Sequence, residues 1–186
     1  GKTTPVIIEN KYSNFSTTSR IPDDEENFFI KKRAYGFSEV LIESSNSKSD
    51  FNDYSVERIS KILNLIKTRT SELYSEKDIK YVFTFKNKGE EVGSSIQHPH
   101  MQIYGMPFVP SVIQKEIENS KTYFSNKGKS LFQDIIDQEK IDKQRIIIDN
   151  NDFITFVPFF ARWAYEVNIM CKSEIQNIVD LDAVSV

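Results

Sequence analysis

The stretch FKNKGEEVGSSIQHPHMQIY, residues 85–104, decides how this chain of 186 residues is interpreted. Its first residues complete a β-branched and aromatic run, KYVFTFK at 80–86, which predicts a strand. Its last residues open a second predicted strand, HMQIYGMPFV at 100–109. Between the two strands lies a polar loop with two glycines, which leads to His98 and His100, the two histidines of the chain.

Pro99 separates the two histidines, and Gln102 follows them. Alternate residues of a strand project from one face, so we expect His98, His100 and Gln102 to line the same side. A neutral imidazole, with a pKa of about 6.5, can attack phosphorus when its other ring nitrogen holds the proton. The pattern therefore indicates phosphate chemistry, with Gln102 donating an amide N–H to a phosphoryl oxygen. Two structural or solvent-facing histidines are the alternative interpretation.

The rest of the chain predicts an α+β domain. Apolar residues recur at intervals of three and four in 55–74, which predicts an amphipathic helix capped by Asp53 or Ser55. Further strands are predicted at 5–9, 37–43, 146–148, 153–156 and 165–170, and further helices at 112–124 and after 128. Strands that adjoin one another and a helix packed on one face are typical of the α+β class.

Composition and charge exclude several kinds of partner. The chain has 24 Lys and Arg against 27 Asp and Glu, a net charge of −3, so it lacks the basic surface that nucleic acid polymers require. Residues 92–114 carry no charged side chain, but they include two His and three Pro, so we expect no membrane span. The single cysteine, Cys171, cannot form an internal disulfide, which favours the reducing cytoplasm.

Residues 85–104 resemble the active-site segment of the galactose-1-phosphate uridylyltransferases, the transferase branch of the histidine-triad superfamily. The resemblance extends to 6–15 and 36–44, which are similar to the first two strands of the family, and to 146–170, which is similar to the opening of its second half. It implies a histidine-triad-like antiparallel sheet with a long packed helix in 1–126. A connecting helix and the start of a second similar repeat would follow in 127–186.

The resemblance also implies roles for individual residues. His100 matches the nucleophile that becomes uridylylated, and the backbone carbonyl of His98 matches the group that fixes its tautomer. Gln102 matches the residue that holds the phosphoryl oxygens. Hydrolytic members of the superfamily have histidine there, so glutamine favours transfer. The positions that match substrate contacts are Asn10, Asn87, Gly93, Ser94 and Ser95. For Asn10, an ordinary turn asparagine is the alternative.

Several members of that family bind a structural zinc, and this chain lacks the corresponding ligands. It has no Cys-x-x-Cys, and Ser47 stands at the position of a ligating histidine. His98 and Cys171 alone cannot complete a four-ligand site. We therefore expect neither a metal nor another cofactor.

Three kinds of function remain open at the level of sequence. The first is a nucleotidyltransferase that moves a uridylyl group between UDP-hexose and hexose 1-phosphate through a covalent nucleotidyl-His100. Its partners would be a nucleotide sugar, a sugar 1-phosphate and a second copy of the chain in a homodimer. The second is a related adenylyl transferase, nucleotide phosphorylase or hydrolase. The third is a degenerate module that binds nucleotide without turnover.

Overall fold

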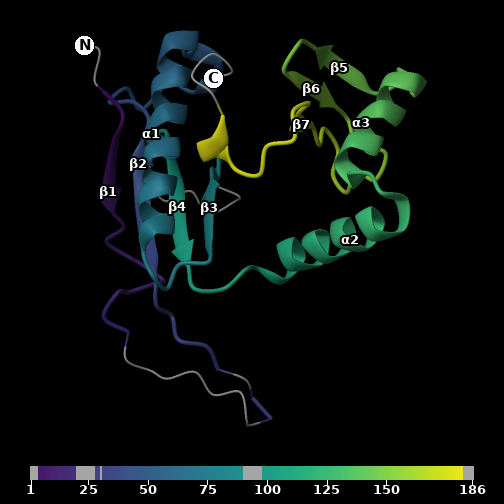
Figure 1. Ribbon diagram of the computed structural model, residues 1–186. Helices are drawn as coiled ribbons and strands as arrows, with labels where there is room; N and C mark the ends of the chain where they lie inside the picture. Colours follow the sequence, from purple (N-terminus) through teal and green to yellow (C-terminus); the bar gives the residue numbers. More distant parts are fainter. Residues whose placement is uncertain (1–3, 20–27, 30, 90–97, 182–186) are drawn as a thin grey trace. The chain divides into compact units, whose positions relative to one another are not determined.

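The computed structural model describes residues 4–19, 28–29, 31–89 and 98–181. The chain divides into two compact units, Gly1–Val109 and Pro110–Ser185, each with its own antiparallel sheet (Figure 1). No helix in the described part of the chain is long and apolar enough to cross a bilayer.

The first unit is built on a four-stranded antiparallel sheet with the order β1-β2-β4-β3. Its strands are β1 (Val6–Glu9), β2 (Phe37–Ile42), β3 (Tyr81–Phe85) and β4 (His100–Met106). β4 lies between β2 and β3, with His100 opposite Ile42 and Gln102 opposite Phe85. The strand that carries the candidate nucleophile is therefore held by hydrogen bonds on both sides.

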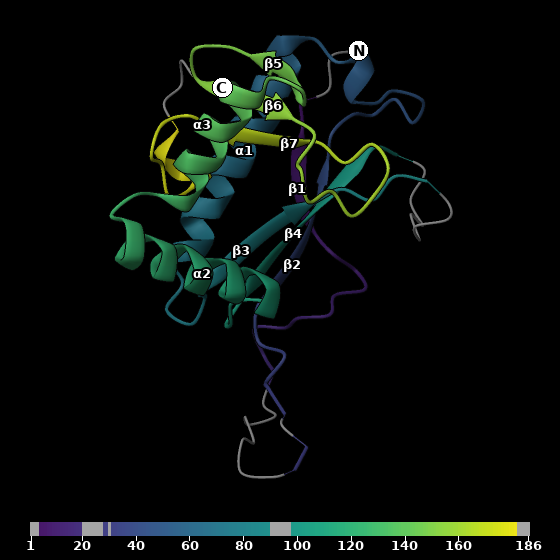
Figure 2. The same cartoon turned by 90° about the vertical axis from the view of Figure 1, so that its right-hand side faces the viewer.

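Helix α1 (Val56–Ser75) lies along this sheet (Figures 1 and 2). The Ser55 side chain accepts a hydrogen bond from the Arg58 backbone N–H, as expected of an N-cap. A short 3-10 helix, Phe51–Asp53, precedes it. The apolar stripe of α1 buries Ile62, Ile66 and Leu73, as the sequence spacing predicts.

An ion pair identifies the face of the sheet that α1 covers. Arg69 of α1 donates to both carboxylate oxygens of Glu39 in β2, at 2.9 and 2.6 Å. Glu39 lies directly opposite Ile103 of β4, which is fully buried. Since side chains alternate along a strand, Ile103 faces the helix, and His100 and Gln102 face the other side.

The second unit consists of two helices and a three-stranded antiparallel sheet with the order β5-β6-β7. Its elements are α2 (Ser111–Lys127), α3 (Leu131–Asp142), β5 (Ile146–Asp149), β6 (Phe153–Phe156), β7 (Asn168–Cys171) and a 3-10 helix, Ile178–Asp180. Ile136 of α3 packs with Ile154 and Phe156 of β6 to form its core. Arg145 extends the packing with an ion pair to Glu139 at 3.0 Å.

The predicted α+β class is confirmed, whereas the predicted division at residue 126 differs from the one in the structure. The structure divides between Val109 and Pro110, and α2 belongs to the second unit. The Tyr123 hydroxyl of α2 donates to the Asp134 carboxylate of α3 at 2.8 Å, which ties the two helices together. This contact depends on packing and has no signature in the local sequence.

Candidate active site

His100 is the first residue of β4, and it is almost completely buried, with 7% of its surface exposed. Its Nδ1 lies 2.9 Å from the backbone carbonyl oxygen of His98. A carbonyl oxygen can only accept a hydrogen bond, so Nδ1 carries the proton and donates it. The Nε2 atom of the neutral ring therefore keeps its lone pair for attack on an electrophile.

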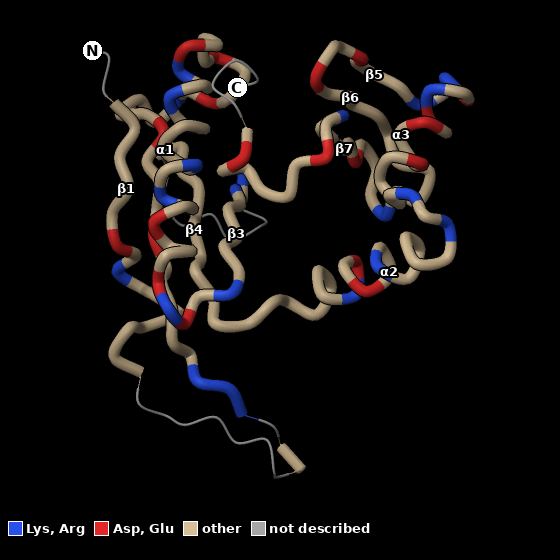
Figure 3. The backbone as a smooth tube through the Cα atoms, viewed as in Figure 1, with Lys and Arg blue, Asp and Glu red and all other residues tan. Residues whose placement is uncertain are grey.

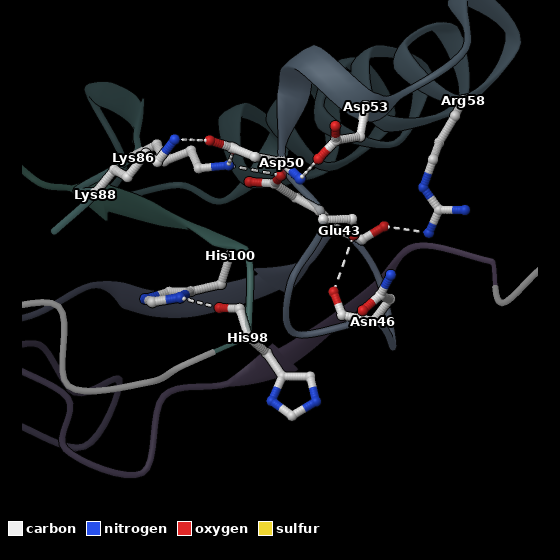
Figure 4. Close-up of polar contacts among 10 residues, drawn as sticks. Glu43, Asn46, Asp50, Asp53, Arg58, Lys86, Lys88, His98 and His100 are labelled. Atoms are coloured by element: carbon white, nitrogen blue, oxygen red, sulfur yellow. Dashed lines mark hydrogen bonds and ion pairs between the residues drawn. The ribbon is translucent and has the colours of Figure 1, made fainter.

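His98 contributes its backbone carbonyl to the site, and its exposed imidazole ring points away from the ring of His100 (Figure 4). The expectation that the His98 side chain would line up with those of His100 and Gln102 is therefore wrong. Strand β4 begins only at His100. Pro99 has no N–H to donate to a ladder, so the strict alternation of a strand does not extend back to His98.

Gln102 follows His100 on the same face of β4, as predicted, and Tyr104 comes next on that face. The Tyr104 hydroxyl donates to Oε1 of Gln102 at 3.1 Å. No Lys, Arg, Asp or Glu occurs in β4, whereas α1 carries both acidic and basic residues (Figure 3). The strand therefore offers hydrogen-bonding side chains and no carboxylate, which would repel an anionic phosphate.

Asn10 lies just after β1, and both polar atoms of its side chain form hydrogen bonds. Its Oδ1 accepts the Tyr12 backbone N–H at 3.0 Å, and its Nδ2 donates to the Ser38 hydroxyl at 3.3 Å. The first contact is that of an ordinary turn asparagine. The second hydrogen bond connects Asn10 to the strand beside the candidate site, because Ser38 of β2 lies directly opposite Tyr104 of β4.

Asn87 is exposed and follows β3 by two residues. Phe85 is opposite Gln102 in the β3–β4 pairing, so the chain at Asn87 leaves the sheet beside His100. Gly93, Ser94 and Ser95, which were predicted to cradle phosphates, lie outside the described residues. Of the predicted site residues, the structure thus brings His100, Gln102, the His98 carbonyl and Asn87 to one end of β4.

A cluster of ion pairs that the sequence did not predict lies next to the two histidines (Figure 4). The Lys86 ammonium lies 2.8 Å from a carboxylate oxygen of Glu43, which is fully buried, and 2.8 Å from one of Asp50. Lys88 also pairs with Asp50. The Glu43 backbone N–H donates to the Pro99 carbonyl at 3.0 Å, so the cluster is connected to the His98–His100 segment.

The two lysines explain the acidity of Asp50. Hydrogen bonds from Lys86 and Lys88 hold the pKa of this carboxyl well below its usual range, and partial burial opposes them only in part. The charged form of Asp50 is therefore the one that the fold stabilises. The residues of the cluster are far apart in sequence, so no local pattern predicts that they meet. The one local hint of an ion pair is a charged residue, Lys86, at the end of the β-branched and aromatic run 80–86.

The described residues do not fit the zinc site of the related proteins. They contain no group of three or more His, Cys, Asp and Glu side chains placed to hold a metal ion. The carboxylates of Glu43 and Asp50, in the cluster beside the histidines, already pair with Lys86 (Figure 4). That no metal is required remains a prediction.

A cavity of about 840 Å³ lies in the second unit, between α2, α3 and the residues that follow β7. Its lining is largely apolar, with Phe124, Phe132 and Met170 among the side chains. None of the predicted site residues that the structure describes lines it. The candidate site is therefore identified by the chemistry at the start of β4 and not by the size of a cavity.

Two family models match the chain. The model described as galactose-1-phosphate uridyl transferase, N-terminal domain, matches residues 2–110, and the model of the C-terminal domain matches residues 116–185. The division between them agrees with the two units of the structure.

Individual proteins of known name are also similar to this chain over nearly its whole length. A galactose-1-phosphate uridylyltransferase of Thermotoga maritima is 30% identical over 94% of this chain and 55% of its own length. An ADP-glucose phosphorylase of Arabidopsis thaliana is 29% identical over 96% of this chain and 50% of its own length. The chain thus spans about half the length of these relatives.

Solved structures extend the likeness to three dimensions. A uridylyltransferase structure superposes with a TM-score of 0.91 at 28% identity, covering 100% of this chain and 59% of that one. The crystal structure of an Arabidopsis thaliana ADP-glucose phosphorylase with bound ADP-glucose superposes with a TM-score of 0.80 at 26% identity, covering 97% and 55%. The histidine at the start of β4, the fold around it and both family models place this chain in the galactose-1-phosphate uridylyltransferase family.

Proposed function

We propose that this chain transfers a uridylyl group between a UDP-hexose and a hexose 1-phosphate through a covalent intermediate on His100. The observation that carries the proposal is the 2.9 Å hydrogen bond from Nδ1 of His100 to the His98 carbonyl. It fixes the tautomer in which Nε2 is the nucleophile. Membership of the uridylyltransferase family supports the choice of substrates.

The reaction proceeds in two displacements at the α-phosphorus. In the first, the Nε2 lone pair forms a bond to phosphorus, and the bond from phosphorus to the bridging oxygen breaks, so that hexose 1-phosphate leaves with that electron pair. In the second, a phosphate oxygen of another hexose 1-phosphate attacks, and the N–P bond breaks. Both displacements use one site, which allows a single set of phosphate contacts to serve both substrates.

Neutral donors stabilise the phosphoryl oxygens in this proposal. Gln102 donates an amide N–H to them, and an amide has no titrating proton with which to activate water, which favours transfer over hydrolysis. Asn10 and Asn87 contact the nucleotide sugar, and Gly93, Ser94 and Ser95 hold the phosphates, as the family resemblance implies. Glycine at residue 93 allows close approach of the backbone.

An adenylyl donor is the second candidate. The Arabidopsis thaliana relative is named an ADP-glucose phosphorylase and matches 96% of this chain. In this alternative, His100 attacks the α-phosphorus of ADP-glucose and glucose 1-phosphate leaves, after which inorganic phosphate accepts the adenylyl group and ADP forms. A degenerate module that binds nucleotide without forming an intermediate is the third alternative.

Intact-mass spectrometry after incubation with UDP-glucose or ADP-glucose distinguishes these functions. We expect an increase equal to one uridylyl group with UDP-glucose and none with ADP-glucose. Addition of galactose 1-phosphate should then remove the adduct faster than inorganic phosphate does. An adenylyl adduct that phosphate discharges would establish the second candidate, and no adduct with either donor would contradict both.

We also propose that the chain works as a homodimer in the cytoplasm. Aromatic side chains of the second unit are largely exposed, among them Phe159 at 82%, Trp163 at 77% and Tyr165 at 98%. Such a surface favours cover by another protein surface, and the lone Cys171 fits a reducing compartment. Sedimentation velocity at micromolar concentration should give the mass of a dimer. A monomer would contradict the proposed homodimer. Recovery of the protein from an extracellular fraction would contradict the proposed location.

A further inference from the structure

The side chain of Gln102 can serve a phosphate with only one of its two ends. The NH₂ group donates hydrogen bonds, whereas the carbonyl oxygen accepts them and repels an anionic oxygen. An amide that rotates freely presents both ends in turn. Some group must therefore hold the oxygen end of Gln102 away from the substrate if the proposed function is correct.

Tyr104 is placed to do this. It is two residues beyond Gln102 on the same face of β4. Its hydroxyl donates to Oε1 of Gln102 at 3.1 Å, which occupies the carbonyl end of the amide. Nδ2 of Asn14 lies 3.5 Å from the same hydroxyl oxygen as a donor. That contact uses the oxygen as an acceptor and leaves the phenolic hydrogen for Gln102.

The ring of Tyr104 is held by two aromatic neighbours. Phe85 of β3 contacts it edge to face, with ring centroids 5.1 Å apart and an interplanar angle of 82°. Phe15, in the connection from β1 to β2, contacts it at 5.5 Å and 69°. Edge-to-face packing of this kind is favourable and directional. The position of the hydroxyl therefore depends on the sheet and the loop, and not on Gln102 alone.

We infer that Tyr104 is a positioning residue that orients the Gln102 amide so that its NH₂ end faces the phosphoryl group. The inference rests on the proposed function, because it concerns how Gln102 serves the nucleotidyl transfer. Tyr104 does not touch the reacting atoms in this role. Phenylalanine would pack against Phe85 and Phe15 equally well, but it could not fix the direction of the amide.

The inference predicts that Tyr104→Phe acts only through Gln102. We expect the variant to slow single-turnover formation of the nucleotidyl adduct roughly fivefold, the factor that one hydrogen bond of ordinary net strength supports. The dissociation constant of the nucleotide sugar should change much less. Tyr12→Phe is the matched control, because Tyr12 is 81% exposed, whereas the hydroxyl that bonds Gln102 is that of Tyr104.

A double-mutant cycle with Gln102→Leu separates positioning from a purely structural role. Gln102→Leu alone should slow adduct formation by more than Tyr104→Phe does, and Tyr104→Phe should add nothing in the Gln102→Leu background. Equal losses from Tyr104→Phe in both backgrounds, or no loss in the wild-type background, would overturn the inference. Absence of an adduct in the wild-type chain would overturn the proposed function, and the inference with it.

Asn14→Ala provides a second variant. We expect it to slow adduct formation less than Tyr104→Phe does, and again only when Gln102 is present.

Discussion

Replacing His100 by asparagine is expected to abolish the covalent adduct and to lower turnover by a factor on the order of 10⁴ or more, as loss of a nucleophile does in other covalent enzymes. The asparagine NH₂ can still donate to the His98 carbonyl in place of Nδ1. The local fold should therefore survive, while the atom that attacks phosphorus is gone. Intact-mass spectrometry and single-turnover kinetics with UDP-glucose measure both effects.

Peptide mapping makes this experiment specific to one histidine. The wild-type adduct should be found on His100 and not on His98, whose ring is exposed and points away from that of His100 (Figure 4). An unchanged unfolding transition shows that the variant is folded. Persistence of the adduct in His100→Asn, or its location on His98, would refute the assignment of the nucleophile.

The local elements of the first unit could be predicted from the sequence. The spacing of Ile62, Ile66 and Leu73 fixes the buried stripe of α1, and Ser55 provides its cap. The alternation in β4 correctly puts His100 and Gln102 on one face. These features depend on residues that are neighbours in the chain, for which periodicity and capping preferences are direct physical signals.

Contacts between distant residues could not be predicted in the same way. The pairing order β1-β2-β4-β3 brings Glu43 beside Lys86 across 43 positions of sequence, and no local pattern encodes that pairing. The hydrogen bond from Tyr104 to Gln102 needs a ring orientation that Phe15 and Phe85 determine from other elements. The family resemblance pointed to His100 as the candidate nucleophile, but it gave no role to Glu43, Lys86 or Tyr104.

Breaking the buried ion pair of Lys86 should destabilise the first unit more than breaking an exposed pair does. Glu43 is fully buried, and the Lys86 side chain is 16% exposed. Lys86→Met leaves the Glu43 carboxylate in the interior without its cation, and loss of one partner of a buried pair costs about 3 kcal/mol or more. We expect a decrease of about that size in the free energy of unfolding of this unit.

Lys88→Met is the matched control. Lys88 pairs with the same Asp50, but its side chain is 69% exposed, and exposed ion pairs contribute little. The single tryptophan, Trp163, belongs to the second unit and not to the unit that contains this cluster. Hydrogen exchange of the β2 and β4 amides in urea is the appropriate measurement. Equal losses in the two variants would show that burial is not the source of the stability.

Two further measurements test the electrostatic origin of the effect. Glu43→Gln added to Lys86→Met removes the unpaired charge, so the double variant should regain much of the lost stability. The second is a titration with acid. Because the lysines lower the pKa of Asp50 in the folded state, the stability that this carboxylate provides is present above its ordinary pKa of about 3.9 and is lost as the pH falls below it. Lys86→Met should weaken this acid dependence. If the double variant with Glu43→Gln is less stable than Lys86→Met alone, the unpaired charge of Glu43 is not the cause of the lost stability.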